Sequence, residues 1–398
     1  MIPLLFGHST LVTAIGRGKS EHIRALREQR SGLQPCHFQG SNLPTYMGMV
    51  EGLEDVSFPS SLSRFHCRNN QLALLGLQQD GFESYIAKAR RQYGSHRIGV
   101  LIGTSTAGIL ETELAYQQKD AVTGKLPASF VPRGRYTQDT FSVAHFVREY
   151  LQLTGPAAVI STACSSSAKV FATASRYIEA GLCEAVVVGG VDSLCLTTLH
   201  GFSALQLTAP GPCRPCDVNR EGLTIGEAAA FIFLENASTN ENQPETRLLG
   251  YGESSDAYHM SHPHPTGQGA TLAMQASLAS SALSISDIDY IHMHGTATVA
   301  NDQTEDRAIA SMFRAETPCS STKGWTGHTL GAAGAVAVAL GDLCLQYGFL
   351  PGCLNTNTID PSFSSQVLLE NQERPIRSIM NNFFGFGGNN CTLILGRR

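Results

Sequence analysis

Residues 157–168 read Ala157-Ala-Val-Ile-Ser-Thr-Ala-Cys-Ser-Ser-Ser-Ala168, and this stretch decides the fold class. An apolar run of strand length leads into a turn of small polar residues. A helical pattern follows, in which Val170, Phe171 and Ile178 share one face. Further Val- and Ile-rich runs of strand length, also next to helical patterns, occur at residues 97–103, 184–190 and 289–295. Buried parallel strands with crossover helices produce this alternation, so the sequence predicts an α/β layered fold.

A second segment repeats the pattern of strand, small-residue turn and helix. Ser321-Thr-Lys-Gly-Trp-Thr-Gly-His-Thr-Leu-Gly-Ala-Ala-Gly334 leads into a helix that we expect to end near Gly348, as the first helix is expected to end at Gly181. Both helices are rich in Ala, Gly and Ser, so both can lie deep in the fold with other backbones close by. The repeat predicts two similar halves, residues 1–240 and 241–398, joined by the polar stretch 236–247.

The composition excludes several classes of protein. The chain has 398 residues, of which 15% are charged and 42% hydrophobic, with 39 glycines. Disorder requires high charge and few large apolar groups, so we expect a compact protein with much surface buried, in part against another subunit. The net charge of -5 argues against nucleic-acid binding.

No targeting or membrane segment is expected. The first residues, Met1-Ile-Pro-Leu-Leu-Phe-Gly7, are too few for a signal peptide, and the most apolar stretch, 331–345, is interrupted by Asp342 and shorter than a bilayer span. The 11 cysteines are an odd number without framework spacing. This pattern favours free thiols in a reducing cytoplasm.

Cys164 is the first candidate for chemistry, because it stands between the expected strand and the expected helix. A strand-to-helix turn exposes a nucleophile, and the helix amino terminus lowers the pKa of a thiol. Any one of 11 cysteines is more often a packed side chain. The small polar groups around Cys164 favour the nucleophile.

Two histidines follow expected strands, at the edge where open α/β sheets build their sites. They lie in His294-Gly-Thr-Ala-Thr298 and in Thr326-Gly-His-Thr-Leu-Gly331. Imidazole donates hydrogen bonds and handles protons near neutral pH, so His294 and His328 join Cys164 in one predicted site. Lys323 would need a partner if buried, for which Glu305 is the candidate; a surface lysine is the alternative.

A glycine cluster, Gly385-Phe-Gly-Gly388, allows the close backbone approach that an oxyanion-binding amide needs, although a plain tight turn has the same residues. No helix follows it, so it is not a dinucleotide fingerprint. Two metal-like patterns are discounted. Cys213-Arg-Pro-Cys216 has no second pair for zinc, and the loop with His259, His262 and His264 has no acidic second shell.

The residues of these motifs and their order along the chain resemble those of the β-ketoacyl-acyl-carrier-protein synthases of the elongating, Cys-His-His type. The resemblance spans nearly the whole chain, since further motifs fall where the family has them: Gly103-Thr-Ser-Thr-Ala-Gly108, Gly189-Gly-Val-Asp192, Arg214-Pro-Cys-Asp217 and Gly252-Glu-Ser-Ser-Asp-Ala257. Thr162-Ala-Cys-Ser-Ser-Ser167 is nearer to polyketide-type synthases than to the fatty-acid enzymes. Three further stretches look most like stand-alone ketosynthases of bacterial aryl polyene pathways: Arg68-Asn-Asn-Gln71, Gly252-Glu-Ser-Ser-Asp-Ala-Tyr-His-Met-Ser261 and Lys323-Gly-Trp-Thr-Gly-His328. The resemblance implies a thiolase fold of five layers, αβαβα.

The resemblance also implies a decarboxylative Claisen condensation in fatty-acid or polyketide-type biosynthesis, with no cofactor and no metal. Cys164 would hold the acyl chain, His294 and His328 would hydrogen-bond the malonyl thioester, and Lys323 with Glu305 would order the histidines. The remaining implied roles are an oxyanion hole of the Cys164 and Phe384 amides, a gate at Phe384, and substrate binding by Thr296, Thr298, Phe384 and Phe386.

The implied partners are an acyl carrier protein, which bears the acyl and malonyl thioesters, and a second subunit in a homodimer or in a heterodimer with a chain-length factor. Arg64 and Arg68 are expected to dock the acidic carrier protein. Docking should be weak, because Phe65, Asn69 and Gln206 stand where relatives often have basic residues. Phe383 replaces a usual Ser, which would alter the gate or the acyl tunnel.

Two other functions stay open at this point. A chain-length factor, which shapes its partner's tunnel, usually lacks the nucleophile, whereas this chain has Cys164, His294 and His328. A degradative thiolase needs a second catalytic cysteine, and Cys391 lies past the glycine cluster in an expected strand.

Overall fold

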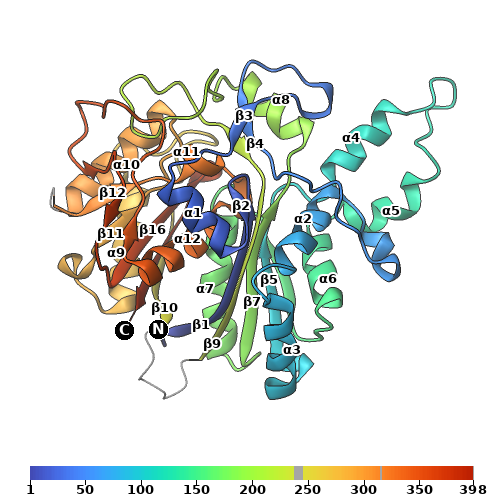
Figure 1. Cartoon of the computed structure of the whole chain (residues 1–398), viewed down its shortest axis with the longest axis horizontal. Coiled ribbons are helices and arrows are strands. Elements are labelled where there is room, and N and C mark those ends of the chain that lie inside the picture. The colour runs from blue at the N-terminus through green and yellow to red at the C-terminus, as the bar shows by residue number, and fades with distance from the viewer. Residues whose placement is uncertain (237–244, 314–315, 398) are drawn as a thin grey trace.

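A computed structural model describes residues 1–236, 245–313 and 316–397. Its main element is a long mixed sheet with two halves (Figure 1). The predicted boundary between residues 240 and 241 lies outside the described residues. Short strand β2 (Gly16–Arg17) pairs with β1 (Leu4–Thr13). The other strands follow one another across the sheet in this order: β14 (Gln366–Val367), β12 (Pro318–Ser320), β11 (Tyr290–His292), β16 (Ser378–Gly385), β17 (Asn389–Arg397), β10 (Thr246–Ser255), β1 (Leu4–Thr13), β9 (Ala228–Asn236), β7 (Ala185–Asp192), β5 (Ile98–Gly103) and β6 (Ala157–Ile160).

The two halves of this sheet have the same topology. The first half runs β6-β5-β7-β9-β1 and the second runs β12-β11-β16-β17-β10. In each half the first three strands of this order pair in parallel and the remaining pairs are antiparallel. The halves meet where β1 pairs with β10 at Leu4 and Leu5. The shared topology confirms the prediction of a fold built from two similar halves.

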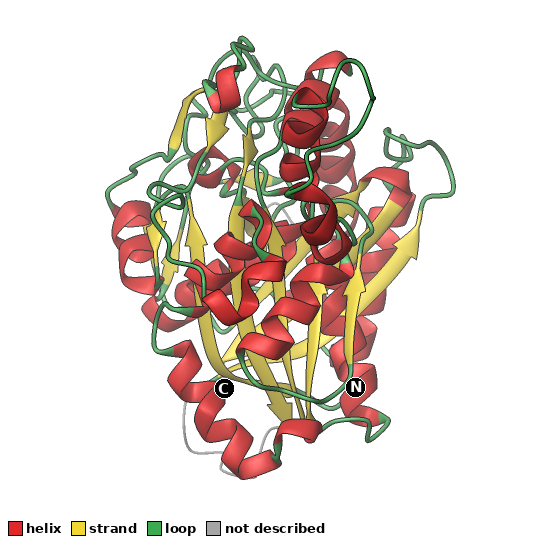
Figure 2. Cartoon of the chain, turned by 90° about the vertical axis from the view of Figure 1, so that its right-hand side faces the viewer, coloured by secondary structure: helices red, strands yellow, loops and turns green. Residues whose placement is uncertain are grey.

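Helices add three layers to the two half-sheets, which makes the five layers expected of a thiolase fold. The middle layer is α7 (Ser166–Glu179) with α12 (Ala333–Tyr347), both of which contact strands of both half-sheets. Alternate residues of β9 show the arrangement, because Ile232 packs with this middle layer while Phe231 and Phe233 pack with the outer helices. The outer layers are α2 (Arg68–Leu77), α3 (Phe82–Tyr93) and α6 (Phe141–Tyr150) on one side, and α9 (Gln268–Ser281) with α10 (Val299–Met312) on the other (Figures 1 and 2).

The remaining elements cap these layers. Helices α4 and α5 project from the body beside α2 and α6 (Figure 1). Their bounds and those of the other small elements are α1 (Lys19–Arg27), β3 (Leu33–Pro35), β4 (Tyr46–Gly48), α4 (Ile109–Gln117), α5 (Phe130–Thr137), α8 (Leu196–Ala204), β8 (Ile225–Gly226), α11 (Lys323–Thr326), η5 (Leu330–Ala332), β13 (Phe349–Leu350) and β15 (Gln372–Glu373).

Helices α7 and α12 meet at their amino-terminal ends, and small residues allow the contact. A Cβ atom added at Gly334 would lie 2.3 Å from the backbone nitrogen of Ala168. The Ser167 hydroxyl accepts a hydrogen bond of 2.9 Å from the Ala335 amide. The prediction that the small-residue helices lie against other backbones is therefore correct at this joint.

Two expectations about apolar segments need correction. Residues 330–347 are long and apolar enough for a bilayer span, with a mean hydropathy of 1.4, although a shorter stretch was expected. This window is 89% buried inside the protein, so it forms the core helix α12 and the short turn that leads into it, and it does not span a membrane. Strand β6 was expected to be buried, but it is half-buried because it is the last strand of its half-sheet.

The first test concerns the joint between α7 and α12. Gly334→Ala should lower the free energy of unfolding by about 1–3 kcal/mol, because the added methyl group overlaps the α7 backbone. Gly201→Ala in α8 is the matched control, since its Cβ meets no atom within 4 Å. That control should raise stability by about 0.5–1 kcal/mol, because Ala is the better helix former. Chemical denaturation measures both, and equal effects would contradict the close approach.

Candidate functional site

Cys164 lies in the turn between β6 and α7, where serines satisfy the backbone. Ser165 Oγ donates to the Thr162 carbonyl at 2.9 Å, and Ser166 Oγ accepts from the Thr162 amide at 2.8 Å. Ala163 has a φ of 52°, a left-handed conformation that L-residues rarely adopt. The small polar sequence around Cys164 thus holds a tight turn that presents the thiol.

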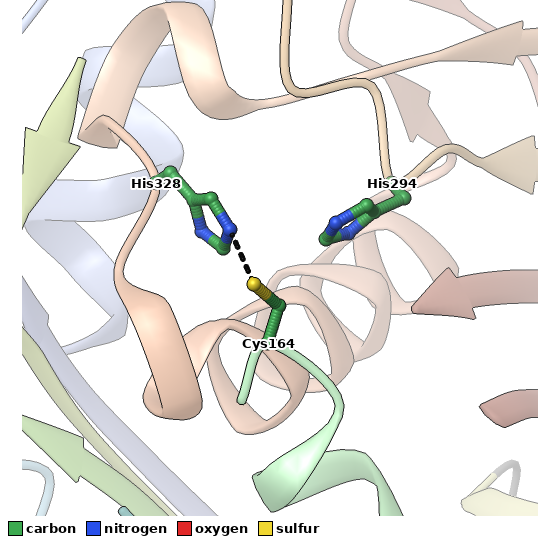
Figure 3. Close-up of side chains that lie close together, drawn as sticks. All are labelled: Cys164, His294 and His328. Carbon is green, nitrogen blue, oxygen red and sulfur yellow. Dashed lines mark hydrogen bonds between the residues drawn. The ribbon is translucent and has the colours of Figure 1, made fainter. Parts of the chain in front are cut away.

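The three residues predicted to form one site do come together (Figure 3). His294 follows β11, and His328 lies between α11 and α12, in the place that Cys164 has in the first half. The Cys164 sulfur and one nitrogen of each histidine all lie within 4.8 Å of one another. The closest approach is 3.0 Å, from His328 Nε2 to Cys164 Sγ, and the two imidazole centroids are 5.4 Å apart.

A backbone amide sets the tautomer of His328. The Leu330 N–H donates to His328 Nδ1 at 3.3 Å, so Nδ1 is the acceptor and Nε2 carries the proton. The Nε2–H group therefore points at the Cys164 sulfur. Burial holds the pKa values of both His294 and His328 well below 6.5, and the charge of Lys323 adds to this effect. Both imidazoles are neutral hydrogen-bond donors at neutral pH.

Glu305 and Lys323 act on the backbone of His294. Glu305 accepts hydrogen bonds of 2.8 Å from the amides of His294 and Gly295, and Lys323 Nζ donates to the His294 carbonyl. Among the described residues no ion pair joins the two side chains, which corrects the predicted pairing. Burial raises the pKa of Glu305 and lowers that of Lys323, while each charge opposes the shift of the other.

The thiol of Cys164 differs from the expectation. A helix amino terminus was expected to lower its pKa, but the side chain is 5% exposed and burial raises the pKa to about 11. The Phe386 amide, the charge of Lys323 and the amide of Cys164 itself oppose this rise. Desolvation outweighs them, so the resting group is a thiol.

The Phe386 amide also corrects the predicted oxyanion hole. The amides that face the sulfur belong to Cys164 and Phe386, where Cys164 and Phe384 were expected. Phe384 is 9% exposed and lies against His294, with ring centroids 6.2 Å apart. The Phe386 ring instead stacks on Phe202 at 5.7 Å. Phe202 was missed, because its position in a helical stretch carries no sequence signal.

One cavity of about 260 Å³ leads to these residues. All four predicted substrate-binding residues line it together with Cys164, and the hydroxyls of Thr296 and Thr298 lie 2.8 Å apart. Its mouth includes Gln206 and His262. Gln206 and His262 are exposed and Cys164 is buried, so the cavity connects the surface of the protein with the nucleophile.

A thiol with two imidazoles is also a possible ligand set for a soft metal. A histidine ligand usually donates its second nitrogen to an acceptor, whereas His328 Nδ1 accepts from an amide. Within the described chain His294 Nδ1 has no hydrogen-bond partner. These surroundings fit hydrogen-bond donation by the ring better than metal binding.

The residues predicted to dock a carrier protein lie in different surroundings. Arg64 is partly exposed, pairs with Glu149 and lies over Phe65. Arg68 is 6% exposed, and its guanidinium binds Glu227 at 2.6 and 2.9 Å and Glu54 at 2.5 Å. Arg68 is therefore a buried structural residue, which corrects the docking prediction. Phe65 and Asn69 are also buried, so they do not thin a surface patch.

Comparisons with known proteins show the family of this chain. The β-ketoacyl synthase N-terminal domain matches residues 10–240, and the C-terminal domain matches residues 246–357. The 3-oxoacyl-[acyl-carrier-protein] synthase 2 of Coxiella burnetii is 30% identical, over 97% of this chain and 96% of that protein. The mitochondrial 3-oxoacyl-[acyl-carrier-protein] synthase of Arabidopsis thaliana is 34% identical, over 75% of this chain and 68% of that protein.

Solved structures agree as well. A ketosynthase (ApeO) in complex with its chain length factor (ApeC), from Xenorhabdus doucetiae, is 36% identical with a TM-score of 0.89, and covers 100% of this chain and 98% of that chain. A β-ketoacyl synthase from Burkholderia phymatum is 26% identical with a TM-score of 0.87, over the whole of both chains. Fold and site define a carbon-carbon bond-forming acyltransferase of the thiolase fold. The chain belongs to the β-ketoacyl synthase family.

The second test concerns the effect of the Lys323 charge on the pKa of the Cys164 thiol. Lys323→Met should raise the pKa of Cys164 further and slow its alkylation by iodoacetamide, about tenfold for each pKa unit at a fixed pH below the pKa. Lys169→Met is the control, because Lys169 is on α7 but lies by Glu253, at 3.6 Å. Peptide mapping follows Cys164 separately from the other cysteines. Equal rates in both variants and the wild type would contradict the electrostatic link.

Proposed function

We propose that the chain condenses malonyl-acyl-carrier-protein with an acyl group held on Cys164, and releases carbon dioxide. The observation that carries this proposal is the meeting of one thiol and two neutral imidazoles at the end of one cavity. A condensation of this kind needs a nucleophile to hold the chain and donors for a developing enolate. It needs no redox step.

The first half-reaction loads Cys164. The sulfur attacks the carbonyl carbon of the acyl thioester, and the thiol proton passes to the departing pantetheine sulfur. Because the pKa of Cys164 is about 11, the His328 Nε2–H donor, 3.0 Å away, helps to stabilise the sulfur as it loses its proton. The amides of Cys164 and Phe386 would bind the oxyanion of the tetrahedral intermediate.

The second half-reaction uses the histidines together. When the malonyl group loses carbon dioxide, the electron pair of the broken C–C bond moves into an enolate. The malonyl thioester oxygen gains negative charge, and neutral His294 and His328 would donate hydrogen bonds to it. The enolate carbon then attacks the acyl carbon on Cys164, and the sulfur leaves. Glu305 and Lys323 serve as positioning residues, since they hold the backbone of His294.

The two other functions are weaker. A chain-length factor has no use for the converged Cys164, His294 and His328. A degradative thiolase would need a second cysteine in the cavity. Cys391 lies in β17, is fully buried and is not among the residues that line the cavity.

The third test separates the two half-reactions. His294→Ala and His328→Ala should still form an acyl adduct from acyl-carrier protein, seen by intact mass. Decarboxylation of malonyl-carrier protein should fall by about two to three orders of magnitude, the usual effect of losing such a donor. The wild-type rate should show no histidine titration near pH 6.5, because both rings are already neutral there.

Cys164→Ala is the matched control for the same experiment. It removes the acceptor sulfur, so the acyl adduct should disappear while the fold persists. Absence of an adduct in the wild type, with several acyl-carrier proteins tried, would overturn the proposed function. Unchanged decarboxylation in both histidine variants would overturn their roles only.

A second subunit is part of the proposal. No strand among the described residues pairs with the outer edge of β6, and its residues Ala157–Ile160 are half-buried in this chain. An apolar edge strand of this kind favours pairing with another strand. The 36% identical ketosynthase was solved with its chain length factor. We infer that β6 pairs with the equivalent strand of a second thiolase-fold chain, in a polyketide-type and specifically aryl polyene pathway. The eleven free cysteines support a cytoplasmic location.

The fourth test targets this edge. The Pro156 carbonyl accepts from the Val100 amide in β5, and the Ile160 carbonyl accepts from the Thr104 amide just after β5. In the alternating parallel ladder the Val159 N–H therefore points away from β5. Val159→Pro removes that outward donor without removing a bond to β5. The variant should keep its fold, but its mass by light scattering should fall from two chains to one. Val159→Thr is the control and should stay paired. A paired Val159→Pro variant would contradict the edge contact.

A further inference from the structure

Asp192 is a fully buried carboxylate at the end of β7 that joins the two halves of the chain. Its Oδ1 accepts four hydrogen bonds of 2.7–2.9 Å from the segment after β5: the hydroxyl of Thr104, the amide of Ser105, and the amide and hydroxyl of Thr106. Its Oδ2 accepts from the Ser105 hydroxyl at 2.7 Å. The same Oδ2 accepts from the Gly331 amide, in the second half, at 2.5 Å.

The contact with Gly331 fixes the backbone that controls His328. Leu330 has a φ of 52°, so it holds the left-handed conformation that a residue with a side chain rarely adopts. The Leu330 N–H donates to His328 Nδ1 at 3.3 Å, and the next amide along the chain, that of Gly331, donates to Asp192. The Leu330 side chain is buried in an apolar cluster with Leu194 and Leu199. The turn is therefore held at three points.

We propose that Asp192 is a positioning residue for His328: through the Gly331 amide it holds the Leu330 turn, which keeps the His328 proton on Nε2 and aimed at Cys164. This inference rests on the proposed function, because the Nε2–H donor matters for the enolate. Four of the six donors to Asp192 come to Oδ1 from the first half. The carboxylate therefore ties the turn of the second half to the frame that also carries Cys164.

The two oxygens of Asp192 have different partners, which makes Asp192→Asn selective. The amide oxygen of Asn is best placed at Oδ1, where four donors converge. The NH₂ group then takes the position of Oδ2 and faces the Gly331 N–H, donor against donor. Ser105 can turn its hydroxyl to accept from the NH₂ group. The substitution thus breaks the contact with the His328 turn and leaves the first-half contacts in place.

The fifth test combines kinetics with the tautomer of His328. In Asp192→Asn, decarboxylation of malonyl-carrier protein should fall by about a hundredfold or more, the size typical for a lost transition-state donor. Acylation of Cys164 should change far less. In protein with ¹⁵N-labelled histidine, the His328 signals, assigned from a His328→Gln sample, should lose the pattern of Nε2–H with Nδ1 as acceptor.

Ser105→Ala is the matched control, because it removes one hydrogen bond to the same Oδ2 without touching the turn. It should keep the wild-type tautomer and decarboxylation rate. Gly331→Ala is the second variant, in case Asp192→Asn does not fold. It keeps the carboxylate, but its Cβ would lie 2.7 Å from Asp192 Oδ2 and push the turn away, so it should show the same kinetic loss and tautomer change.

The outcomes separate this inference from the proposed function. If the wild type neither acylates nor decarboxylates, the proposed function is wrong, while the tautomer change still tests the Asp192 contact. If the wild type is active and a folded Asp192→Asn or Gly331→Ala variant keeps both the His328 tautomer and the decarboxylation rate, the positioning role is overturned. Equal losses of acylation and decarboxylation with an unchanged tautomer would also overturn it.

Discussion

The close contact between the amino-terminal ends of α7 and α12 is the constraint on which the rest of the structure depends. No side chain fits at Gly334, where an added carbon would lie 2.3 Å from α7 backbone. Because the two helices start so near each other, the residues just before them are also neighbours. Cys164 precedes α7 and His328 precedes α12, and their reactive atoms are 3.0 Å apart. The packing of glycine and alanine in the core therefore sets the distance between nucleophile and donor.

Burial then decides the charge state of the site. Desolvation keeps the thiol of Cys164 protonated against the opposing charge of Lys323. It also keeps both imidazoles neutral, and there the charge of Lys323 acts in the same direction. The charged groups hold backbone instead: Glu305 and Lys323 bind the main chain of His294. The rings are thus left free to donate hydrogen bonds to a group that becomes charged only during reaction, which is the condition for selective stabilisation of a transition state.

Much of this site could be predicted from the sequence, because Cys164, His294 and His328 each follow an expected strand and strand ends meet at one edge of a sheet. The helix ends could be predicted from Gly181 and Gly348, and the duplication from the repeated pattern of strand, small-residue turn and helix. Other features depend on long-range geometry. The charge of Arg68 suggested a surface residue, yet Glu227 and Glu54 enclose it. The sequence could not show which phenylalanine near the glycine cluster has its amide facing the Cys164 sulfur, and the structure shows that it is Phe386 rather than Phe384. The role of Asp192 depends on a contact 139 residues away.

The repeated topology determines when the active site is completed during folding. Each half of the chain holds an incomplete set of reactive groups, with Cys164 in one and His294 with His328 in the other, and the two sets meet only across the joint of α7 and α12. A chain that has folded one half, during synthesis or after damage, has no complete site. Activity therefore reports on completed folding, and a reactive thiol gains its hydrogen-bond donors only once the whole core has closed around it.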